Sequence, residues 1–201
     1  MRIGILGGTF NPPHLGHLVS AQEAYLQLRL DRVALIPARI PPHKPVEDEP
    51  GIEHRLEMCR LAIAGDERRF EVSDLEARRE GTSYTVDTLE ELHANQPESE
   101  LFLIVGGDVA LGFGSWQDPE RVLALATLAV AQRPGTPRSE VERTLSEVAG
   151  GEKARFFSMP EIGISSTMLR ERARDGEPTR YLVPDAVRSY IDRYRLYGGS
   201  Q

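Results

Sequence analysis

Short apolar runs alternate with helical stretches along almost the whole chain, and this alternation limits the fold more than any other feature. The runs expected to form strands are residues 2–6, 32–36, 69–72, 101–105, 127–131 and 156–157. Strands separated by helical stretches of about 10–15 residues are typical of βαβ units, which build a parallel sheet with helices on both faces. The sequence therefore predicts a doubly wound α/β fold, with residues 1–201 forming a single domain.

Five stretches have the composition of helices. The stripe at i, i+4, i+7 and i+11 that marks the buried face of a helix is formed by Ile52, Leu56, Cys59 and Ile63. The other helices are expected over residues 15–30, from Thr85 as N-cap towards 96, over 165–174, and from Pro184 with Val187, Ile191 and Tyr194 facing inwards. The C-terminal helical part thus covers about residues 163–196. Residues 37–51 contain five prolines and are expected to form a long loop.

Composition and charge exclude several classes of protein. The chain has 24 basic and 31 acidic residues, so its net charge of −7 argues against binding nucleic acid through a basic surface. Its one cysteine, Cys59, excludes an internal disulfide and a Cys-rich zinc module. We see neither an apolar run of the roughly 18 residues that span a bilayer nor a signal-peptide pattern. A cytoplasmic protein without a membrane or nucleic-acid partner is expected, and nothing indicates its oligomeric state.

The end of the first predicted strand carries the most specific motif. Ligands of doubly wound sheets bind outside the carboxyl ends of the strands, and here the strand is followed by GGTFNPPHLGH, residues 7–17. Glycines at a helix start let backbone N–H groups approach an anion. His14 and His17 are three residues apart, so both lie on one face of the first helical turn. Gly16 between them removes a side chain where a ligand could press close.

Other interpretations of this motif remain open. A Gly-Gly turn after a strand is often purely structural, and paired histidines can bind zinc. A metal site would need a third ligand, and no acidic residue or cysteine stands nearby in sequence. The glycine spacing fits neither the GxGxxG fingerprint nor a P-loop.

A second anion site is predicted near the C-terminus. Ser165 is a natural N-cap, and the hydroxyls of Ser166 and Thr167 lie in the first helical turn. Arg170 follows Ser166 by four residues and should point the same way. The alternative is simple capping with a solvated arginine. Together, the two helix starts describe a cleft for a polyphosphate. His43 and Lys44, in the proline-rich loop, offer two further donors unless that loop is merely solvated.

Several motifs in the same order resemble those of a known family. GTFNPPHLGH resembles the HIGH-like signature of nucleotidyltransferases of the α/β-phosphodiesterase superfamily, and ISSTMLR resembles their second motif. The finer pattern resembles the bacterial nicotinate-nucleotide adenylyltransferases. It comprises GGTFNPPHLGHL, IPxxxPPHK, SYT at 83–85, VGGD at 105–108, Trp116 and QRPG at 132–135, and it covers about residues 1–196.

The resemblance implies a reaction in NAD biosynthesis. ATP and nicotinate mononucleotide would give deamido-NAD (nicotinic acid adenine dinucleotide) and pyrophosphate, through direct attack of the mononucleotide phosphate on the ATP α-phosphate. His17 and His14 would contact the ATP phosphates, with His17 nearest the reacting centre. Mg²⁺ would bridge ATP oxygens with few protein ligands. The other ATP-binding residues would be Gly8, Thr9, Phe10, Lys44, Gly106, Asp108, Arg133, Ser166, Thr167 and Arg170.

The resemblance also implies a pocket for the mononucleotide. Trp116 would stack on the pyridine ring, although a core position is the alternative for the single tryptophan. Backbone N–H groups near Thr85 and Gln117 would receive the nicotinate carboxylate, and His43 and the backbone of Thr9 and Phe10 would line the same substrate. The chain departs from the family at Ala38-Arg39, where an asparagine is common. Arg39 would then either contact the mononucleotide phosphate or point to solvent.

Two other functions compete with this one. Another transferase of the superfamily, such as a phosphopantetheine adenylyltransferase, would typically be shorter and lack the PPHK loop and Trp116. A regulator or oxidoreductase that uses a dinucleotide would carry GxGxxG and an acidic residue about 20 positions beyond it. The sequence has neither feature, which favours the adenylyltransferase.

Overall fold

The residues that the structure describes form one six-stranded parallel sheet. The structure is a computed structural model that describes residues 1–42, 48–132 and 135–198. The strands are β1 (Arg2–Gly8), β2 (Arg32–Pro37), β3 (Phe70–Val72), β4 (Glu100–Gly106), β5 (Ala126–Gln132) and β6 (Arg155–Ser158). Their order across the sheet is β3-β2-β1-β4-β5-β6, and every neighbouring pair is parallel. The doubly wound α/β prediction is confirmed.

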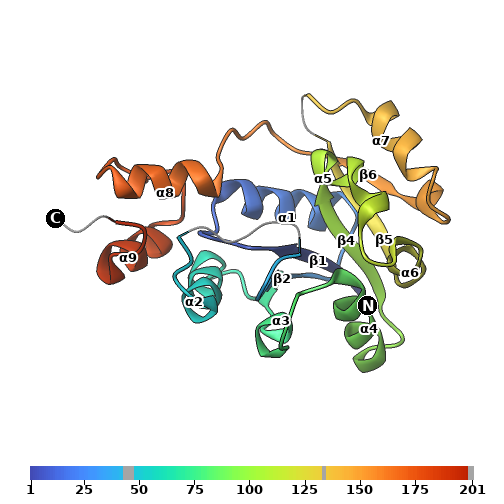
Figure 1. Ribbon diagram of the computed structural model, residues 1–201, viewed down its shortest axis with the longest axis horizontal. Helices are drawn as coiled ribbons and strands as arrows, with labels where there is room; N and C mark the ends of the chain where they lie inside the picture. Colours follow the sequence, from blue (N-terminus) through green and yellow to red (C-terminus); the bar gives the residue numbers. More distant parts are fainter. Residues whose placement is uncertain (43–47, 133–134, 199–201) are drawn as a thin grey trace.

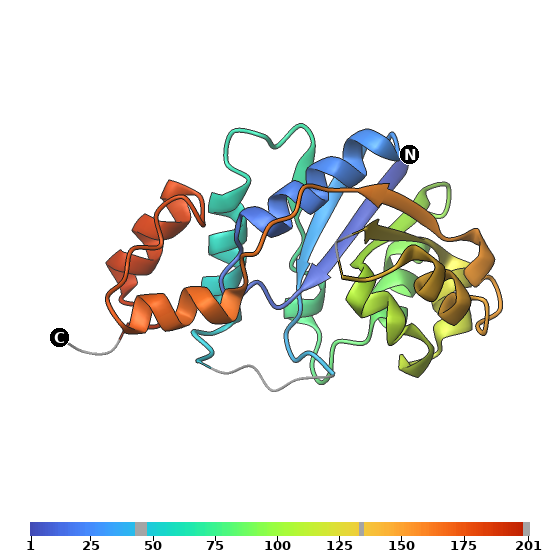
Figure 2. The same ribbon diagram turned by 90° about the horizontal axis from the view of Figure 1, so that it is seen from above.

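Helices cover both faces of this sheet (Figure 1, Figure 2). The longer ones are α1 (Leu15–Gln27), α2 (Ile52–Ala62), α4 (Thr85–Asn95), α6 (Pro119–Leu125), α7 (Arg138–Leu145), α8 (Ser166–Arg174) and α9 (Asp185–Tyr194). Short helical segments are α3 (Leu75–Arg78), α5 (Gly107–Leu111), η1 (Phe113–Ser115) and η2 (Gly151–Lys153). The sequence analysis missed α3, α5, α6 and α7, because short or highly charged helices lack a clear apolar stripe.

Alternating strand residues build a core on each face. Val33 and Leu35 pack in the cluster that includes Ala21 and Ala24 of α1, whereas Ala34 and Ile36 belong to the cluster on the opposite face. This period of two follows from the pleat of a strand that is buried on both sides. Gly4 lies in close packing, since an added Cβ would lie 2.7 Å from Cδ1 of Leu30 and the Leu30 side chain would have to shift.

A third apolar cluster joins the C-terminal helices to α2. Met58 of α2 packs with Leu169 of α8 and with Val187 and Ile191 of α9, and both C-terminal helices lie beyond the end of the sheet in Figure 1. The inward position expected for Tyr194 is wrong, because 47% of that residue is exposed. Among the described residues, no helix is both long and apolar enough to cross a membrane.

Helix boundaries differ from the expected ones by a few residues. The first helix ends at Gln27 rather than near residue 30, with Leu28 as its C-cap. Thr85 is the first residue of α4 and Tyr84 is its N-cap, so the expected capping role of Thr85 is wrong. The described parts of the proline-rich segment, residues 38–42 and 48–51, contain neither helix nor strand, as expected.

Candidate active site

A cleft of about 420 Å³ opens at the carboxyl ends of the central strands. β1 and β4 are the neighbours at which the order of the strands reverses, and ligands of such sheets bind at that point. The predicted site residues that line the cleft are Gly8, Thr9, His17, Thr85, Gly106, Asp108 and Trp116. Residues predicted for both substrates therefore meet in one place.

The two histidines form a stacked pair at the start of α1. Their ring centroids are 3.8 Å apart, and the backbone N–H of His14 donates a hydrogen bond to Nδ1 of His17 at 3.2 Å. A nitrogen that accepts this bond carries no proton, so in the neutral imidazole the proton lies on Nε2 of His17. His14 is buried, whereas His17 lines the cleft. His17 therefore lines the cleft, and the proton of its neutral ring lies on Nε2.

The glycine between the histidines serves the pair itself. A Cβ added to Gly16 would lie 3.0 Å from Cε1 and from Nδ1 of His14. The His14 ring is therefore a close neighbour of Gly16 within the chain. A side chain at this position would require the His14 ring to shift by a few tenths of an ångström.

Phe10 anchors the turn between β1 and α1. Its ring is 1% exposed, packs in the core, and meets the His17 ring edge-on with the centroids 4.9 Å apart. The backbone of Phe10 is left-handed, with φ of 50°. Phe10 is buried as a whole residue and is not among the residues that line the cleft.

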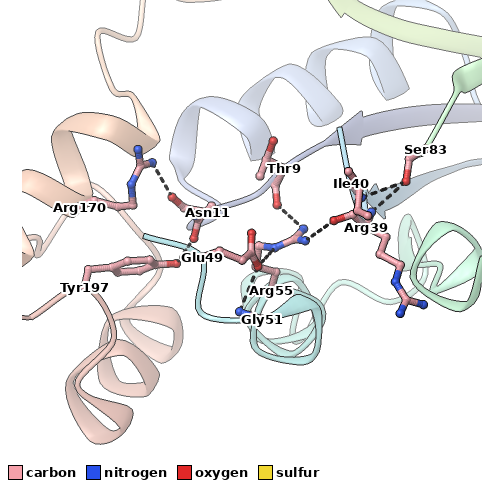
Figure 3. A network of polar contacts seen from close by, with 10 residues as sticks. All are labelled: Thr9, Asn11, Arg39, Ile40, Glu49, Gly51, Arg55, Ser83, Arg170 and Tyr197. Carbon is pink, nitrogen blue, oxygen red and sulfur yellow. Dashed lines mark hydrogen bonds and ion pairs between the residues drawn. The ribbon is translucent and has the colours of Figure 1, made fainter. Parts of the chain in front are cut away.

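The second motif bonds directly to the first. Ser165 caps α8 by accepting a hydrogen bond from the N–H of Met168, as the sequence predicts. Oγ of Ser166 donates to the carbonyl of Pro12 at 2.9 Å. Figure 3 shows the second bond, in which Nη1 of Arg170 donates to the carbonyl of Asn11 at 3.1 Å. Ser166 and Arg170 therefore face the same way, as their spacing predicts. Thr167 is exposed, with its Oγ1 3.5 Å from Nη2 of Arg170.

Trp116 both packs against the core and faces the cleft. It follows η1, its ring centroid lies 5.1 Å from that of the buried Phe113, and its side chain is partly buried. It also lines the cleft, so the two alternatives for the tryptophan are combined in one position. Gln117 is exposed and is not among the residues that line the cleft.

The sequence analysis missed two polar residues on the Thr85 side of the cleft. Glu76 of α3 is buried, and its Oε1 accepts a hydrogen bond from Oγ1 of Thr88 at 2.8 Å. Burial raises the pKa of this carboxyl despite the hydrogen bonds that it accepts from Thr88 and Ser83. Ser83 accepts a hydrogen bond from the backbone N–H of Arg39 at 3.0 Å. No periodic pattern marks a four-residue helix such as α3, so neither contact had a clear signal in the sequence.

Two arginines close to the cleft donate hydrogen bonds to backbone carbonyls, which the sequence did not predict. Arg39 is exposed, in keeping with the solvent alternative, and its Nη1 also donates to the carbonyl of Ala77 at 3.0 Å. Arg55 is 1% exposed and donates to the carbonyls of Thr9 and Arg39 (Figure 3). Its sequence signal was its position, because Arg55 stands four residues before Cys59 on the buried face of α2.

Three predicted residues, His43, Lys44 and Arg133, lie outside the described residues. Within the described part of the chain, no group of three or more His, Cys, Asp or Glu side chains is arranged to hold a metal ion. The carboxylates that line the cleft are those of Glu76 and Asp108.

Comparisons with known proteins agree on one kind of relative. The family described as cytidylyltransferase-like matches residues 5–172. A protein of Geobacter metallireducens named "Probable nicotinate-nucleotide adenylyltransferase" is 42% identical to this chain, with 98% of each chain covered. A protein of the same name from Desulfitobacterium hafniense is also 42% identical, with 98% of this chain and 95% of that protein covered.

Solved structures show the same fold. The nicotinic acid mononucleotide adenylyltransferase of Plasmodium falciparum, in complex with NaAD, superposes with a TM-score of 0.78, covering 98% of this chain and 97% of that chain. The same enzyme in complex with APC gives the same TM-score. Sequence identity to these structures is only 20% and 19%, so they bear on the fold alone.

Proposed function

Because the chain belongs to the family of nicotinate-nucleotide adenylyltransferases, we propose that its cleft joins ATP to nicotinate mononucleotide. The chain is a nucleotidyltransferase of NAD biosynthesis, and its products are deamido-NAD and pyrophosphate. Small molecules are its substrates. The proposal assigns each of the two substrates to particular residues of the cleft and its rim.

The observation that carries the assignment of ATP is the meeting of two helix starts. α1 and α8 begin next to each other, tied by the hydrogen bonds from Ser166 to Pro12 and from Arg170 to Asn11. The N-terminus of a helix attracts anions through its free N–H groups and its dipole. Two such ends side by side suit the phosphate chain of ATP, with Thr167 and Arg170 near the β- and γ-phosphates. We assign Lys44 to the same phosphates.

The rest of ATP is assigned along β4 and β5. Gly106 ends β4 and Asp108 follows in the first turn of α5, with its side chain exposed at the cleft. A carboxylate in this position suits hydrogen bonds from ribose hydroxyls. We assign Arg133 to the adenine or its ribose. The contact between the second motif and residues 11–12 also supports the proposal that residues 1–201 act as one domain.

The chemistry follows from what the cleft offers. A phosphate monoester is already anionic at pH 7, so the mononucleotide needs no base to become a nucleophile. One of its oxygens forms a bond to the α-phosphorus as the bond from that phosphorus to pyrophosphate breaks, and the leaving group departs with the electron pair. Catalysis then consists of alignment and of donors that meet the developing charge. Nε2 of His17, Gly8 and the backbone of Thr9 and Phe10 are assigned to the reacting phosphates, and His14 holds His17.

The mononucleotide is assigned to the side of the cleft formed by Thr85 and Trp116. Thr85 opens α4, so the N–H groups of that helix start suit the nicotinate carboxylate. Trp116 offers an aromatic face for the pyridine ring, and Gln117 would contribute through its backbone N–H. We also assign His43 to this substrate. The N–H donors of that helix start would favour the carboxylate of nicotinate over the amide of nicotinamide.

A divalent metal ion is expected with ATP in this family, and we propose Mg²⁺. Mg²⁺ typically binds through substrate phosphates, water and one or two carboxylates rather than through a cage of side chains. The exposed carboxylate of Asp108 at the cleft fits that pattern. When bound, the ion would neutralise phosphate charge and orient the ATP chain.

The proposal is tested by incubating the purified chain with ATP and nicotinate mononucleotide. Deamido-NAD and pyrophosphate should appear in equal amounts, and neither should form when the mononucleotide is omitted. Release of pyrophosphate from ATP alone, or consumption of ATP without a dinucleotide product, would contradict the proposal.

A further inference from the structure

Arg55 is a buried charge that binds backbone carbonyls rather than a substrate. It lies on α2, and its side chain is 1% exposed. Nη1 donates to the carbonyl of Thr9 at 2.8 Å and Nη2 to the carbonyl of Arg39 at 3.3 Å. Nε donates to Oε1 of Glu49 at 2.7 Å. A guanidinium is a rigid planar fork, so these three contacts fix three separate segments relative to one another.

Two of the three segments border the cleft, since Thr9 lines it and Arg39 follows the cleft-lining Ala38. Thr9 follows β1 and lines the cleft, Arg39 follows β2, and Glu49 precedes α2. Oε1 of Glu49 also accepts a hydrogen bond from the N–H of Gly51, the N-cap of α2. The carboxylate therefore ties the guanidinium to the start of the helix that carries Arg55 (Figure 3).

The contact with Thr9 fixes the orientation of one peptide plane. In a trans peptide, the C=O and the following N–H point in opposite directions. Holding the Thr9 carbonyl against Arg55 therefore turns the N–H of Phe10 to the opposite side. Phe10 has a left-handed φ of 50°, a conformation that a residue with a side chain rarely adopts without such support.

The contact with Arg39 extends the network to the other side of the cleft. The backbone N–H of Arg39 donates to Oγ of Ser83 at 3.0 Å, and the N–H of Ser83 donates to the carbonyl of Ile40 at 2.8 Å. Ser83 stands two residues before Thr85, at the edge assigned to the mononucleotide. A continuous set of hydrogen bonds thus runs from Thr9 through Arg55 and Arg39 to Ser83 (Figure 3).

We propose that Arg55, paired with Glu49, is a positioning residue that holds the Thr9–Phe10 peptide and the residue 39–40 segment in the alignment needed for adenylyl transfer. This inference rests on the proposed function, since it concerns the alignment of the two substrates of that reaction. Arg55 touches neither substrate in this account. Its effect is on the relative placement of the reacting phosphates, which is felt in kcat rather than in KM.

The first test is Arg55→Lys, which keeps the charge but replaces the fork by one flexible ammonium. We expect kcat to fall by about 10- to 100-fold, because misplacement by about 1 Å can cost that much. The KM values for both substrates should stay within about threefold, since equal loss of ground-state and transition-state binding would instead raise KM. Amide hydrogen exchange of peptides covering residues 9–17 should also become faster.

Ile63→Ala is the matched control for lost stability. Ile63 is buried at the C-cap of α2 and packs in the core, and its apolar side chain takes no part in the hydrogen bonds of Arg55. The Ile63→Ala variant should lower the melting temperature at least as much as Arg55→Lys does. At temperatures below its unfolding transition, its kcat should stay within about twofold of the wild-type value. Its amide hydrogen exchange in residues 9–17 should be unchanged.

Glu49 provides a second test that does not depend on tolerance of a buried lysine, since its side chain is 31% exposed. Glu49→Ala removes the acceptor for Nε and should lower kcat by about three- to tenfold, in the direction expected when a charged donor loses its partner. Glu49→Gln keeps an oxygen that accepts from both Arg55 and Gly51 and should restore kcat to within about twofold.

Two outcomes would overturn the inference while leaving the proposed function intact. One is a wild-type enzyme that makes deamido-NAD together with a folded Arg55→Lys variant of normal kcat. The other is a control that loses activity like its test variant. This holds if kcat falls as much in Ile63→Ala as in Arg55→Lys, or as much in Glu49→Gln as in Glu49→Ala. A wild-type chain that makes no deamido-NAD would overturn the proposed function and this inference together.

Discussion

The backbone N–H of His14 donates a hydrogen bond to Nδ1 of His17, and the two rings stack with their centroids 3.8 Å apart. This bond fixes the tautomer of His17, and we assign the N–H at Nε2 of the neutral ring to a phosphate oxygen. His17→Ala should therefore lower kcat by at least about 100-fold, the scale of one lost oxyanion-type donor. The melting temperature should change little, because His17 lines the cleft and is partly exposed.

A pair of amide substitutions separates the two ring nitrogens. The side-chain nitrogen of glutamine can reach the position of Nε2, whereas that of asparagine is closer to the position of Nδ1. His17→Gln should retain more activity than His17→Asn when pyrophosphate release is measured under saturating substrates. The opposite order, or near-normal turnover of a folded His17→Ala variant, would remove Nε2 from the mechanism.

Arg170→Ala should weaken the binding of ATP more than the binding of AMP. A charge-assisted contact to a terminal phosphate is worth roughly 1.5–3 kcal/mol, or about 10- to 150-fold in Kd. AMP lacks those phosphates and should lose much less. Because Arg170 also donates to the carbonyl of Asn11, the substitution should lower the free energy of unfolding by about 1–3 kcal/mol.

Arg172→Ala is the matched control for Arg170→Ala, since it removes the same charge from the same helix at a partly exposed position. Its Kd for ATP should stay within about twofold of the wild-type value. Calorimetric titration of ATP and AMP into both variants makes the comparison. If ATP and AMP lost equal affinity in Arg170→Ala, the assignment of Arg170 to the β- and γ-phosphates would be wrong.

Trp116→Ala should raise the KM for nicotinate mononucleotide and leave the KM for ATP nearly unchanged. Stacking of a base on an aromatic side chain is worth roughly 1–3 kcal/mol, which corresponds to about 5- to 150-fold in affinity. Since the ring also packs on Phe113, the variant should be less stable, so assays belong well below its melting temperature. Trp116→Phe should retain part of the affinity for nicotinate mononucleotide and part of the stability.

Fluorescence gives an independent measure of the same contact, because Trp116 is the single tryptophan of the chain. Titration of the wild-type protein with nicotinate mononucleotide should change the emission intensity in a saturable way. Emission that ignores the mononucleotide, together with an unchanged KM in Trp116→Ala, would show that the residue serves the core alone.

Glu76 should make stability depend on pH in a way that a single substitution reveals. Burial raises the pKa of this carboxyl above the ordinary value of about 4.3. The native state therefore holds the proton more tightly, and the stability contributed by Glu76 is present below that ordinary value and is lost as pH rises through the raised pKa.

Glu76→Gln removes this titration while its carbonyl can still accept from Oγ1 of Thr88. From about pH 4 upwards, the free energy of unfolding of the wild type should fall relative to that of Glu76→Gln. Urea unfolding at a series of pH values measures the difference. Parallel pH profiles for the two proteins would contradict the account of Glu76.

Local patterns predicted the parts of the site that lie close together in sequence. The glycines and histidines of residues 7–17 indicated the end of a strand and the start of a helix. In the second motif, the sequence correctly predicted the Ser165 cap and the common direction of Ser166 and Arg170. These features depend on period and capping, which a few neighbouring residues determine.

Contacts between distant segments were beyond the reach of such patterns. Nothing near Arg55 in the sequence indicates that its partners are the carbonyls of Thr9 and Arg39, 46 and 16 residues away. In the same way, the sequence did not indicate that the His14 ring lies against Gly16, because the position of that ring depends on the tertiary fold. Buried polar groups form hydrogen bonds with partners that only the folded chain brings close to them.

Adenylyl transfer to nicotinate mononucleotide is tested most directly by letting two mononucleotides compete for one labelled nucleotide. ATP labelled at the α-phosphate is mixed with equal concentrations of nicotinate and nicotinamide mononucleotides, and the labelled dinucleotides are separated and counted. We expect the label to enter deamido-NAD at least about tenfold faster than it enters NAD, which corresponds to a difference in activation free energy of about 1.4 kcal/mol. Equal labelling of both dinucleotides would contradict the assigned carboxylate pocket, and the absence of a labelled dinucleotide would contradict adenylyl transfer itself.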